Sequence, residues 1–199
     1  MAVDAKKVLV GTPDQLTTGA ILCAPLGTKL PTLDDLTPTG VTLDEAFKDA
    51  GYANEDGVTL TPDMSTSGIK EWGGAIVRNV LEEFNGNIAF TLIQTDEMAF
   101  KMAFGDDYVT VSKATSTHGN QLMAKLGAHL PDAKSWVFKM KDGGARMLVL
   151  VPNGQVTTLD EITFNSTDPI GWAITLSCYP DKDGHSIYIL TDDGQLATA

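Results

Sequence analysis

The segment Ser67–Lys113 constrains the fold more than any other part of the chain, because turn, strand and helix signals follow one another in it without a gap. Asn85-Gly86 fits a two-residue hairpin turn, since both residues tolerate positive φ. After this dipeptide, residues 88–92 alternate between large apolar and small or polar side chains, the period-2 pattern of a strand with one buried face. The segment therefore predicts an antiparallel hairpin at its centre.

A short amphipathic helix is predicted directly after this hairpin. Thr95 is the expected N-cap, and two acidic residues follow in the first turn, where the helix dipole favours negative charge. Gly105 provides a stop. The apolar side of the helix would be formed by Met98, Met102 and Phe104. Since a strand is predicted next at Tyr108–Val111, the segment indicates a helix packed on an antiparallel sheet.

The rest of the chain shows short strand patterns separated by turn residues. Strands are predicted at Gly19–Pro25, Val58–Leu60, Ser135–Lys141, Arg146–Val151, Gln155–Asn165, Gly171–Tyr179 and Ser186–Leu190. Residues 114–131 suit either a short helix or strands. Turns every eight to twelve residues or so, with few helices, predict a mainly β fold, an antiparallel β-sandwich or barrel.

A long loop excursion is predicted over residues 26–67, between the first strand and the central hairpin. Thr42-Leu43-Asp44-Glu45 matches a capping box and predicts a second short helix of about two turns. Loops of this length in compact domains usually serve a function. The β-sandwich domain is expected over residues 19–195, between an N-terminal arm at 1–18 and a C-terminal tail at 196–199.

The charge of the chain argues against nucleic-acid binding. It carries 26 acidic residues against 14 basic ones, for a formal net charge of −12, and has no cluster of Lys and Arg that could displace phosphate counterions. An acidic surface repels phosphate and leaves a duplex free to slide, although the charge also fits simple solubility. Since no long apolar run or signal peptide is recognisable, we expect a soluble protein made in a reducing cytoplasm.

No catalytic, cofactor or metal site is predicted, and the chain is not expected to be an enzyme. It lacks the nucleophile elbow, the phosphate loop and the dinucleotide fingerprint, and its three histidines have no ligand spacing. Asp181–Gly184 fits a hairpin turn better than a calcium loop. Cys23 and Cys178 are predicted to be buried apolar residues, while a disulfide between them stays open.

The order of these elements resembles the major tail tube proteins of long-tailed, siphovirus-type bacteriophages. The resemblance begins at Gly68-Ile69-Lys70-x-Trp72 and continues through the hairpin and Phe90–Thr95 into the helix. Downstream it includes Val151–Val156 and Asp168–Trp172. It covers roughly residues 18–193 and implies a tail-tube β-sandwich with one helix on the sheet.

The resemblance also implies a function. Copies of the subunit would close into hexameric rings, and the rings would stack into a hollow tube for DNA ejection. Each copy would add its strands to its neighbours' sheets, so that no free sheet edge faces the lumen. Its partners would be further copies, the tape-measure protein and other tail proteins, with double-stranded DNA passing through without specific binding and with no membrane. Its place would be the virion tail, assembled in the host bacterial cytoplasm.

Two sets of residues are candidates for roles in such an assembly. The first set would border an acidic lumen and also fits ordinary exposed acids: Glu82, Glu83 and Asp107. The second set lies in the excursion and would contact neighbouring subunits: Leu30, Leu33, Leu36, Phe47 and Tyr52.

Two other functions stay open from the sequence. One is another tail or secretion-tube component, namely a terminator, a baseplate hub or an inner tube, because these share the fold. The other is a monomeric carbohydrate-binding β-sandwich, which would display a flat row of exposed aromatic side chains. Only 7% of the residues are aromatic, and the patterns around Trp72, Trp136 and Trp172 predict that all three are buried in strands.

Overall fold

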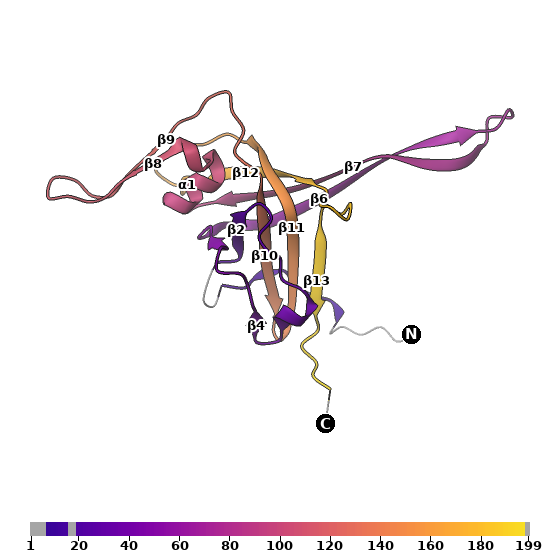
Figure 1. Cartoon of the computed structure of the whole chain (residues 1–199), viewed down its shortest axis with the longest axis horizontal. Helices are drawn as coiled ribbons and strands as arrows, with labels where there is room; N and C mark the ends of the chain where they lie inside the picture. The colour runs from indigo at the N-terminus through magenta and orange to yellow at the C-terminus, as the bar shows by residue number, and fades with distance from the viewer. Residues whose placement is uncertain (1–6, 16–18, 198–199) are drawn as a thin grey trace.

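The computed structural model describes residues 7–15 and 19–197. Figure 1 shows a β-sheet body from which two hairpins project in opposite directions. The strands are β1 (Thr12–Pro13), β2 (Ile21–Pro25), β3 (Leu36–Thr37), β4 (Gly40–Val41), β5 (Lys48–Asp49), β6 (Ala53–Lys70), β7 (Ile76–Leu92), β8 (Val109–Ser112), β9 (Gln121–Ala124), β10 (Lys134–Asp142), β11 (Ala145–Leu159), β12 (Trp172–Tyr179) and β13 (Tyr188–Asp192). The helices are α1 (Glu97–Phe104) and the 3-10 turns η2 (Leu33–Asp35) and η3 (Asp106–Tyr108).

Nine strands form one antiparallel sheet in the order β5-β2-β10-β11-β12-β7-β6, with β1 added on β10 and β13 on β11. Strand β11 is long enough to pair with two strands along one edge. Its residues 146–150 pair with β13, and its residues 153–159 pair with β12. The mainly β, antiparallel fold with one α-helix on the sheet is therefore confirmed for the described residues.

Strand β10 is buried on both faces, because apolar side chains pack on each side of it. Trp136 and Phe138 belong to the larger core cluster, together with residues of β7, β12 and α1. Val137 points to the other face, into a smaller cluster that is covered by the segment following β2. The spaced apolar residues of that segment, among them Leu36 and Phe47, exist to cover this second face.

Helix α1 begins one residue later than the sequence predicted. Asp96 is the N-cap in place of Thr95, and its Oδ1 accepts a hydrogen bond from the backbone N–H of Ala99 at 2.8 Å. The Thr95 hydroxyl instead accepts a hydrogen bond from the indole N–H of Trp172 at 3.3 Å. Gly105 ends the helix with a φ of 96°, so the predicted stop is confirmed.

The strands of the second half lie close to their predicted positions. The hairpin of β10 and β11 is confirmed, as are the strands that correspond to β2, β12 and β13. The strand predicted over residues 155–165 ends earlier, at Leu159, because its partner β12 begins only at Trp172. In the ambiguous stretch 114–131, the structure has strand β9, which pairs with β8.

The central hairpin turns at a different place from the one predicted. Asn85 and Gly86 do not form a turn, because β7 runs straight through them and pairs there with β6. Glycine is required at position 86 by close packing: a Cβ there would lie 2.7 Å from Cδ1 of Ile187 and 3.5 Å from Cβ of Cys178. The chain reverses instead at residues 71–75, before β7 begins.

The excursion is shorter than predicted, and its helix is elsewhere. Strand β6 begins at Ala53, so residues 53–67 belong to the hairpin. The helix predicted from the capping box at Thr42 is wrong, since Asp44 Oδ1 accepts a hydrogen bond from Ala46 N at 2.9 Å and turns the chain. The second short helix of the excursion is η2, where Asp35 Oδ2 accepts a hydrogen bond from the backbone N–H of Thr32 at 2.9 Å.

Two tryptophans are buried as predicted, and the third is not. Trp136 and Trp172 are 1% and 7% exposed, whereas Trp72 lies outside the strands and is fully exposed. Both cysteines are buried and free, so neither forms a disulfide. Burial raises the pKa of the Cys23 thiol to about 11 and that of Cys178 to about 12.

We predict that Trp136→Ala lowers the free energy of unfolding by about 3–5 kcal/mol, because it leaves a large cavity in the core. It also removes the hydrogen bond from the indole N–H to the carbonyl of Gly154, which is 3.0 Å long. Urea unfolding measures the change. Trp72→Ala is the matched control and should stay within about 0.5 kcal/mol of the wild type, since its side chain packs against nothing in the isolated chain. Equal losses in the two variants would contradict the assignment of Trp136 to the core.

Candidate interface

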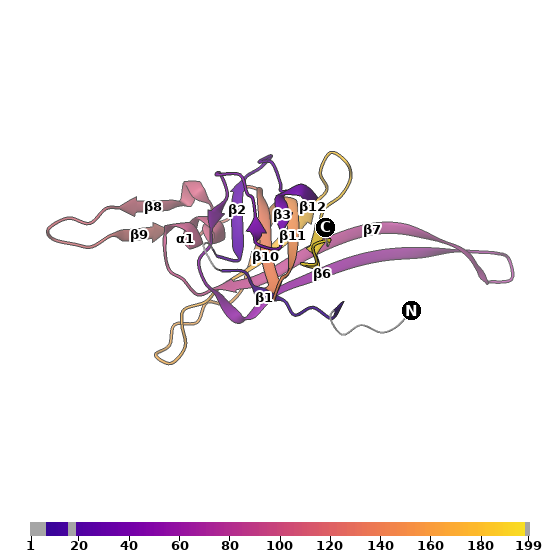
Figure 2. The same cartoon turned by 90° about the horizontal axis from the view of Figure 1, so that it is seen from below.

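Hairpin β6–β7 extends far beyond the body of the protein (Figures 1 and 2). Strand β7 pairs with β12 only over Gly86–Leu92. Farther out, β6 and β7 pair only with each other, and every residue from 63 to 85 is exposed. These residues are termed the arm. An arm of this length has no core of its own, so its surface is available for contacts with other molecules.

One face of the arm continues the core-facing side of the hairpin's base. In the body, this side carries the cross-strand pair Leu60 and Ile88, which packs in the larger core cluster. Because successive side chains alternate between faces, every second pair outward from there lies on the same side. The large apolar residues of this apolar face are Met64, Ile76, Leu81 and Phe84, and all are exposed. The apolar side that faces the core in the body therefore continues along the arm, where its side chains are exposed.

Of two β-bulges in β7, the one at Glu82 keeps this face apolar. Register shifts leave Glu82 and Val77 without a partner on β6. Without the first bulge, strict alternation would place Glu82 on the apolar face in place of Leu81. Gly68 contributes as well, since a Cβ at this position would come within 3.1 Å of the Ile76 side chain. The arm thus presents a mainly apolar surface on this face, which Thr66, Asn79 and Lys70 share by register.

The other face of the arm is mixed in character. It carries Ser65, Ser67, Ile69, Arg78, Val80 and Glu83. The outer arm, residues 64–81, contains Lys70 and Arg78 against a single acid, Glu71, and so has a formal charge of +1. The whole chain has a formal charge of −12. The whole arm, residues 63–85, also contains Asp63, Glu82 and Glu83 and has a formal charge of −2, so only its outer part is suited to approach the acidic surface of another copy.

The tip of the arm is a closed turn that presents an aromatic side chain. The backbone N–H of Glu71 donates to the carbonyl of Ala75, and that of Gly74 donates to Glu71, both at 2.9 Å. Gly74 has a φ of 90°, a conformation that side chains rarely adopt. Trp72 lies in this turn and is fully exposed. A fully exposed tryptophan is unusual, because indole burial is strongly favourable.

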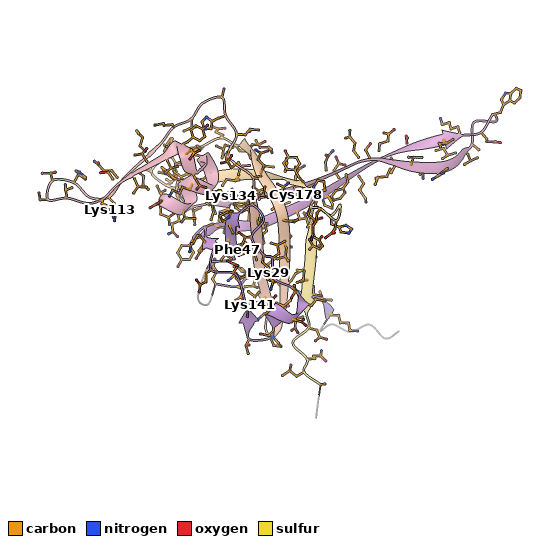
Figure 3. The ribbon with its side chains drawn as sticks, viewed as in Figure 1. Lys29, Phe47, Lys113, Lys134, Lys141 and Cys178 are labelled. Carbon is orange, nitrogen blue, oxygen red and sulfur yellow. The ribbon has the colours of Figure 1, made fainter. Side chains whose placement is uncertain are left out.

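The second hairpin, β8–β9, projects from the opposite side of the body, where Lys113 marks its outer part (Figure 3). It pairs only with itself and exposes Val111 and Met123. At its base, the rings of Tyr108 and His129 stack with their centroids 3.4 Å apart. This hairpin offers less apolar surface than the arm.

A cavity of about 590 Å³ lies where the N-terminal segment, β2, β10 and the first residues of β6 meet. Its wall is mainly apolar and includes Pro13, Ile21, Tyr52, Val58, Phe138 and Met140. Asn54 also lines the cavity, and its Oδ1 is buried without a hydrogen-bond partner in the described chain, while its Nδ2 donates to Asp56 at 2.6 Å. A buried acceptor without a donor is costly, so this oxygen is a local cost to the fold beside the cavity.

The N-terminal wall of this cavity is held by a buried ion pair. Asp14 accepts a hydrogen bond from Nη1 of Arg146, and Lys141 Nζ lies 3.7 Å from its other oxygen. The backbone N–H of Asp14 donates to the carbonyl of Lys139 at 3.1 Å. Burial lowers the pKa of the Lys139 ammonium, while the carboxylates of Asp14 and Asp49 oppose that shift. These contacts hold residues 12–14 of the predicted N-terminal arm against β10; residues 1–6 and 16–18 lie outside the described residues.

The acids predicted to border a lumen lie in two separate places. Glu83 is on the mixed face of the arm opposite Ser65, and Glu82 is the bulged residue beside it. Asp107 is in η3, just after α1, on the side of the body away from the arm (Figure 1). All three are exposed, but one chain does not bring them together. Their orientation toward a lumen stays a prediction.

The residues predicted to contact neighbours differ in how much surface they have left. Leu33 and Tyr52 are exposed, and Leu30 is half-buried. Leu36 and Phe47 are 5% and 7% exposed, because they cover the second face of β10 (Figure 3 labels Phe47 inside the body). Their contacts to other subunits stay predictions, with Leu33 and Tyr52 the best placed for them.

The sequence reading missed the arm, although a signal for it was present. Gly73-Gly74 is itself a hairpin-turn dipeptide, flanked by strand-forming residues. The predicted turn at Asn85-Gly86 lies instead at the edge of the body and would divide β7 into two strands. The choice of Gly73-Gly74 would have given two long strands and an exposed tip.

No group of three or more His, Cys, Asp or Glu side chains in the described part of the chain is placed to hold a metal ion. Among the same residues, no helix is long and apolar enough to span a membrane.

Comparison with known proteins gives one strong match. The family model described as phage tail tube protein matches residues 1–199. No curated protein matches the sequence. Among solved structures, the cryo-EM structure of the anti-feeding prophage cap, a tube-terminating cap, is similar at 13% sequence identity and a TM-score of 0.45, over 96% of this chain and 100% of that chain.

We predict that Asp14→Ala destabilises the fold by about 3–5 kcal/mol, because it leaves the guanidinium of Arg146 buried without its carboxylate. Limited proteolysis should then cleave within residues 7–15, which stay protected in the wild type. The double variant Asp14→Leu/Arg146→Met removes both charges and should recover most of the stability lost, as measured by urea unfolding. A single variant as stable as the wild type would show that the ion pair does not hold this segment.

Proposed function

This chain belongs to the phage tail tube protein family, and from that premise we propose that it is the repeating structural subunit of a phage tail tube. In this proposal, its copies assemble into hexameric rings, and the rings stack into a hollow conduit for DNA ejection. The observation that carries the proposal is the apolar face of the arm, which extends the core surface of the subunit into solvent. Such a surface is stable in water only when another molecule covers it.

In this proposal, further copies of the same chain cover the apolar face of the arm. The outer arm has a formal charge of +1, and it would meet bodies that are strongly acidic. Both outer edges of the arm carry unpaired backbone groups, which can add to a neighbour's sheet. Closed rings and stacks use the same contact many times, so a modest energy for each contact supports a stable tube.

The charge of the chain suits a conduit for DNA. Carboxylates facing the bore would repel the phosphates of a passing duplex, whereas clustered Lys and Arg would bind them and slow passage. With 26 acids against 14 bases, an acidic lining requires no special arrangement. Glu82, Glu83 and Asp107 are proposed for that lining, the two glutamates from the arm and Asp107 from η3. The tape-measure protein and other tail proteins would be further partners, in a virion tail assembled in the bacterial cytoplasm.

Other tail components and a carbohydrate-binding module are the alternative functions. A terminator would form single rings that do not stack, so electron micrographs of concentrated protein separate it from a tube subunit. A carbohydrate module would be monomeric and would need a row of exposed aromatic rings. Trp136 and Trp172 are buried, so Trp72 is the one tryptophan of the three that such a row could use.

We predict that Leu81→Ser/Phe84→Ser abolishes polymers at concentrations where the wild type forms them. Each change removes an apolar side chain from the apolar face, and together they should raise the concentration needed for assembly by about tenfold or more. Sedimentation and negative-stain microscopy measure this.

The matched control for this prediction is Ile69→Ser/Val80→Ser, which makes the same kind of change on the mixed face of the same arm. It should shift the required concentration by about twofold at most. Equal effects from the two pairs would mean that the apolar face is not the assembly surface.

We predict that Glu82→Lys/Glu83→Lys leaves tubes intact and slows DNA release from phage particles that carry the variant, because four units of charge per subunit change in favour of phosphate binding. A time course of triggered release, followed with a DNA dye, measures the effect. Asp160→Lys/Glu161→Lys makes the same charge change at two exposed residues in another part of the body. Normal release from the first variant, or equal slowing in both, would remove these two glutamates from the lumen lining.

A further inference from the structure

Trp72 and the cavity at the start of β6 are complementary. We propose that the indole of Trp72 from one copy binds in this cavity of a second copy, as the anchor of the contact between subunits. The inference rests on the proposed function and adds to it a specific donor side chain and a specific receptor. Of the residues predicted to contact neighbouring subunits, Tyr52 lines this receptor.

The donor is preorganised. Two backbone hydrogen bonds close the turn that carries Trp72, so little backbone entropy remains to be lost on binding. The indole is fully exposed and offers a large apolar surface together with one N–H donor. Exposed aromatic anchors that fill a pocket on the partner are the side chains that dominate association energies.

The receptor matches this chemistry. At about 590 Å³ the cavity is in the size range of sites that bind small aromatic groups, and its wall is mostly apolar. The indole N–H is a donor only, and the cavity lining includes Asn54, Glu55 and Asp56, whose side chains carry acceptor oxygens.

Charge complementarity favours the same orientation. Lys70 precedes the tip of the arm by two residues, and Glu55 and Asp56 line the cavity. An ammonium that approaches together with the indole would meet these two carboxylates at the rim. Rim charges contribute little to affinity, but they set the approach and the register of two partners.

The contact has to join two copies. The cavity lies at the first residues of β6 and Trp72 lies just beyond its last, so the 18-residue strand separates them. At about 3.3 Å per residue this distance is on the order of 50 Å, so a chain cannot reach its own cavity. Each copy offers one donor and one receptor at different places, which is the head-to-tail geometry that propagates a stack.

The first experiment compares the assembly of Trp72→Ala and Trp72→Phe with that of the wild type by sedimentation. Trp72→Ala should raise the concentration needed for assembly by about tenfold or more, and Trp72→Phe should raise it less, because a phenyl ring still fills part of the cavity. Both variants should unfold at the wild-type urea midpoint, since Trp72 packs against nothing in the isolated chain.

The second experiment blocks the receptor with Gly11→Phe. Gly11 lines the cavity with no strain on its backbone, and its Cβ would find only the sulfur of Met140, at 3.8 Å. Gly11→Phe alone should also fail to form long polymers. An equimolar mixture with Trp72→Ala holds one intact donor and one intact receptor, so it should pair once and stop, giving a short species that neither variant forms alone.

Tryptophan fluorescence tests directly whether Trp72 becomes buried on assembly. Acrylamide should quench Trp72 in the dilute wild type and lose access to it on assembly, and Trp72→Phe should show no such change. If the wild type never polymerises, the proposed function is wrong and the anchor fails with it. Two other results would contradict only the proposed anchor. One is that Trp72→Ala polymerises at the same concentration as the wild type, and the other is that acrylamide still quenches Trp72 in the polymer. The cavity would then bind another group.

Discussion

The pairing of β7 with β12 is the interaction on which the rest of the structure depends. Over Gly86–Leu92, β7 sits between β6 and β12, and its Ile88, Phe90 and Leu92 are buried in the larger core. A two-stranded ribbon alone is marginal in water. The arm is ordered because its inner half is part of a broad sheet, and a change that loosens this inner half would loosen the outer half with it.

An unsupported ribbon with an apolar face is also a risk, and the sequence limits that risk. Flat strand edges pair indiscriminately with other chains. Pro62 in β6 lacks an N–H, and the bulges at Val77 and Glu82 twist β7 out of a regular ladder. Because of these features, the arm is better suited to bind a partner of complementary shape than to pair with an arbitrary exposed strand. The arm therefore combines exposure with selectivity.

The sequence predicted those parts of the fold whose buried face is covered by the same chain. The β10–β11 hairpin, β12 and α1 were found because alternation, turn dipeptides and capping residues agreed there. The arm was missed because alternation reports that a face is apolar and says nothing about which molecule covers it. Trp72 was assigned to a core for the same reason.

Local motifs failed where tertiary packing imposed another conformation. The residues at Thr42–Glu45 satisfy a capping box, yet Phe47 is needed in the cluster under β10, and a tight turn at Asp44 delivers it there where a helix would not. Gly86 likewise looked like half of a turn and is instead a contact point for Ile187. In both cases the sequence contains an informative residue, but the conformation there is set by contacts with residues that are distant in the sequence.

Charge and apolar contact have separate tasks in a subunit with this composition. Bodies at −12 repel one another over about 8 Å at physiological salt, so random encounters are unfavourable. The outer arm at +1 is the exception and can approach an acidic body without that repulsion. Once it is close, the energy comes from covering apolar side chains, which salt screens little. Orientation is thus selected by charge and retained by burial, and this division allows an acidic protein to assemble while its remaining surface stays repellent to DNA.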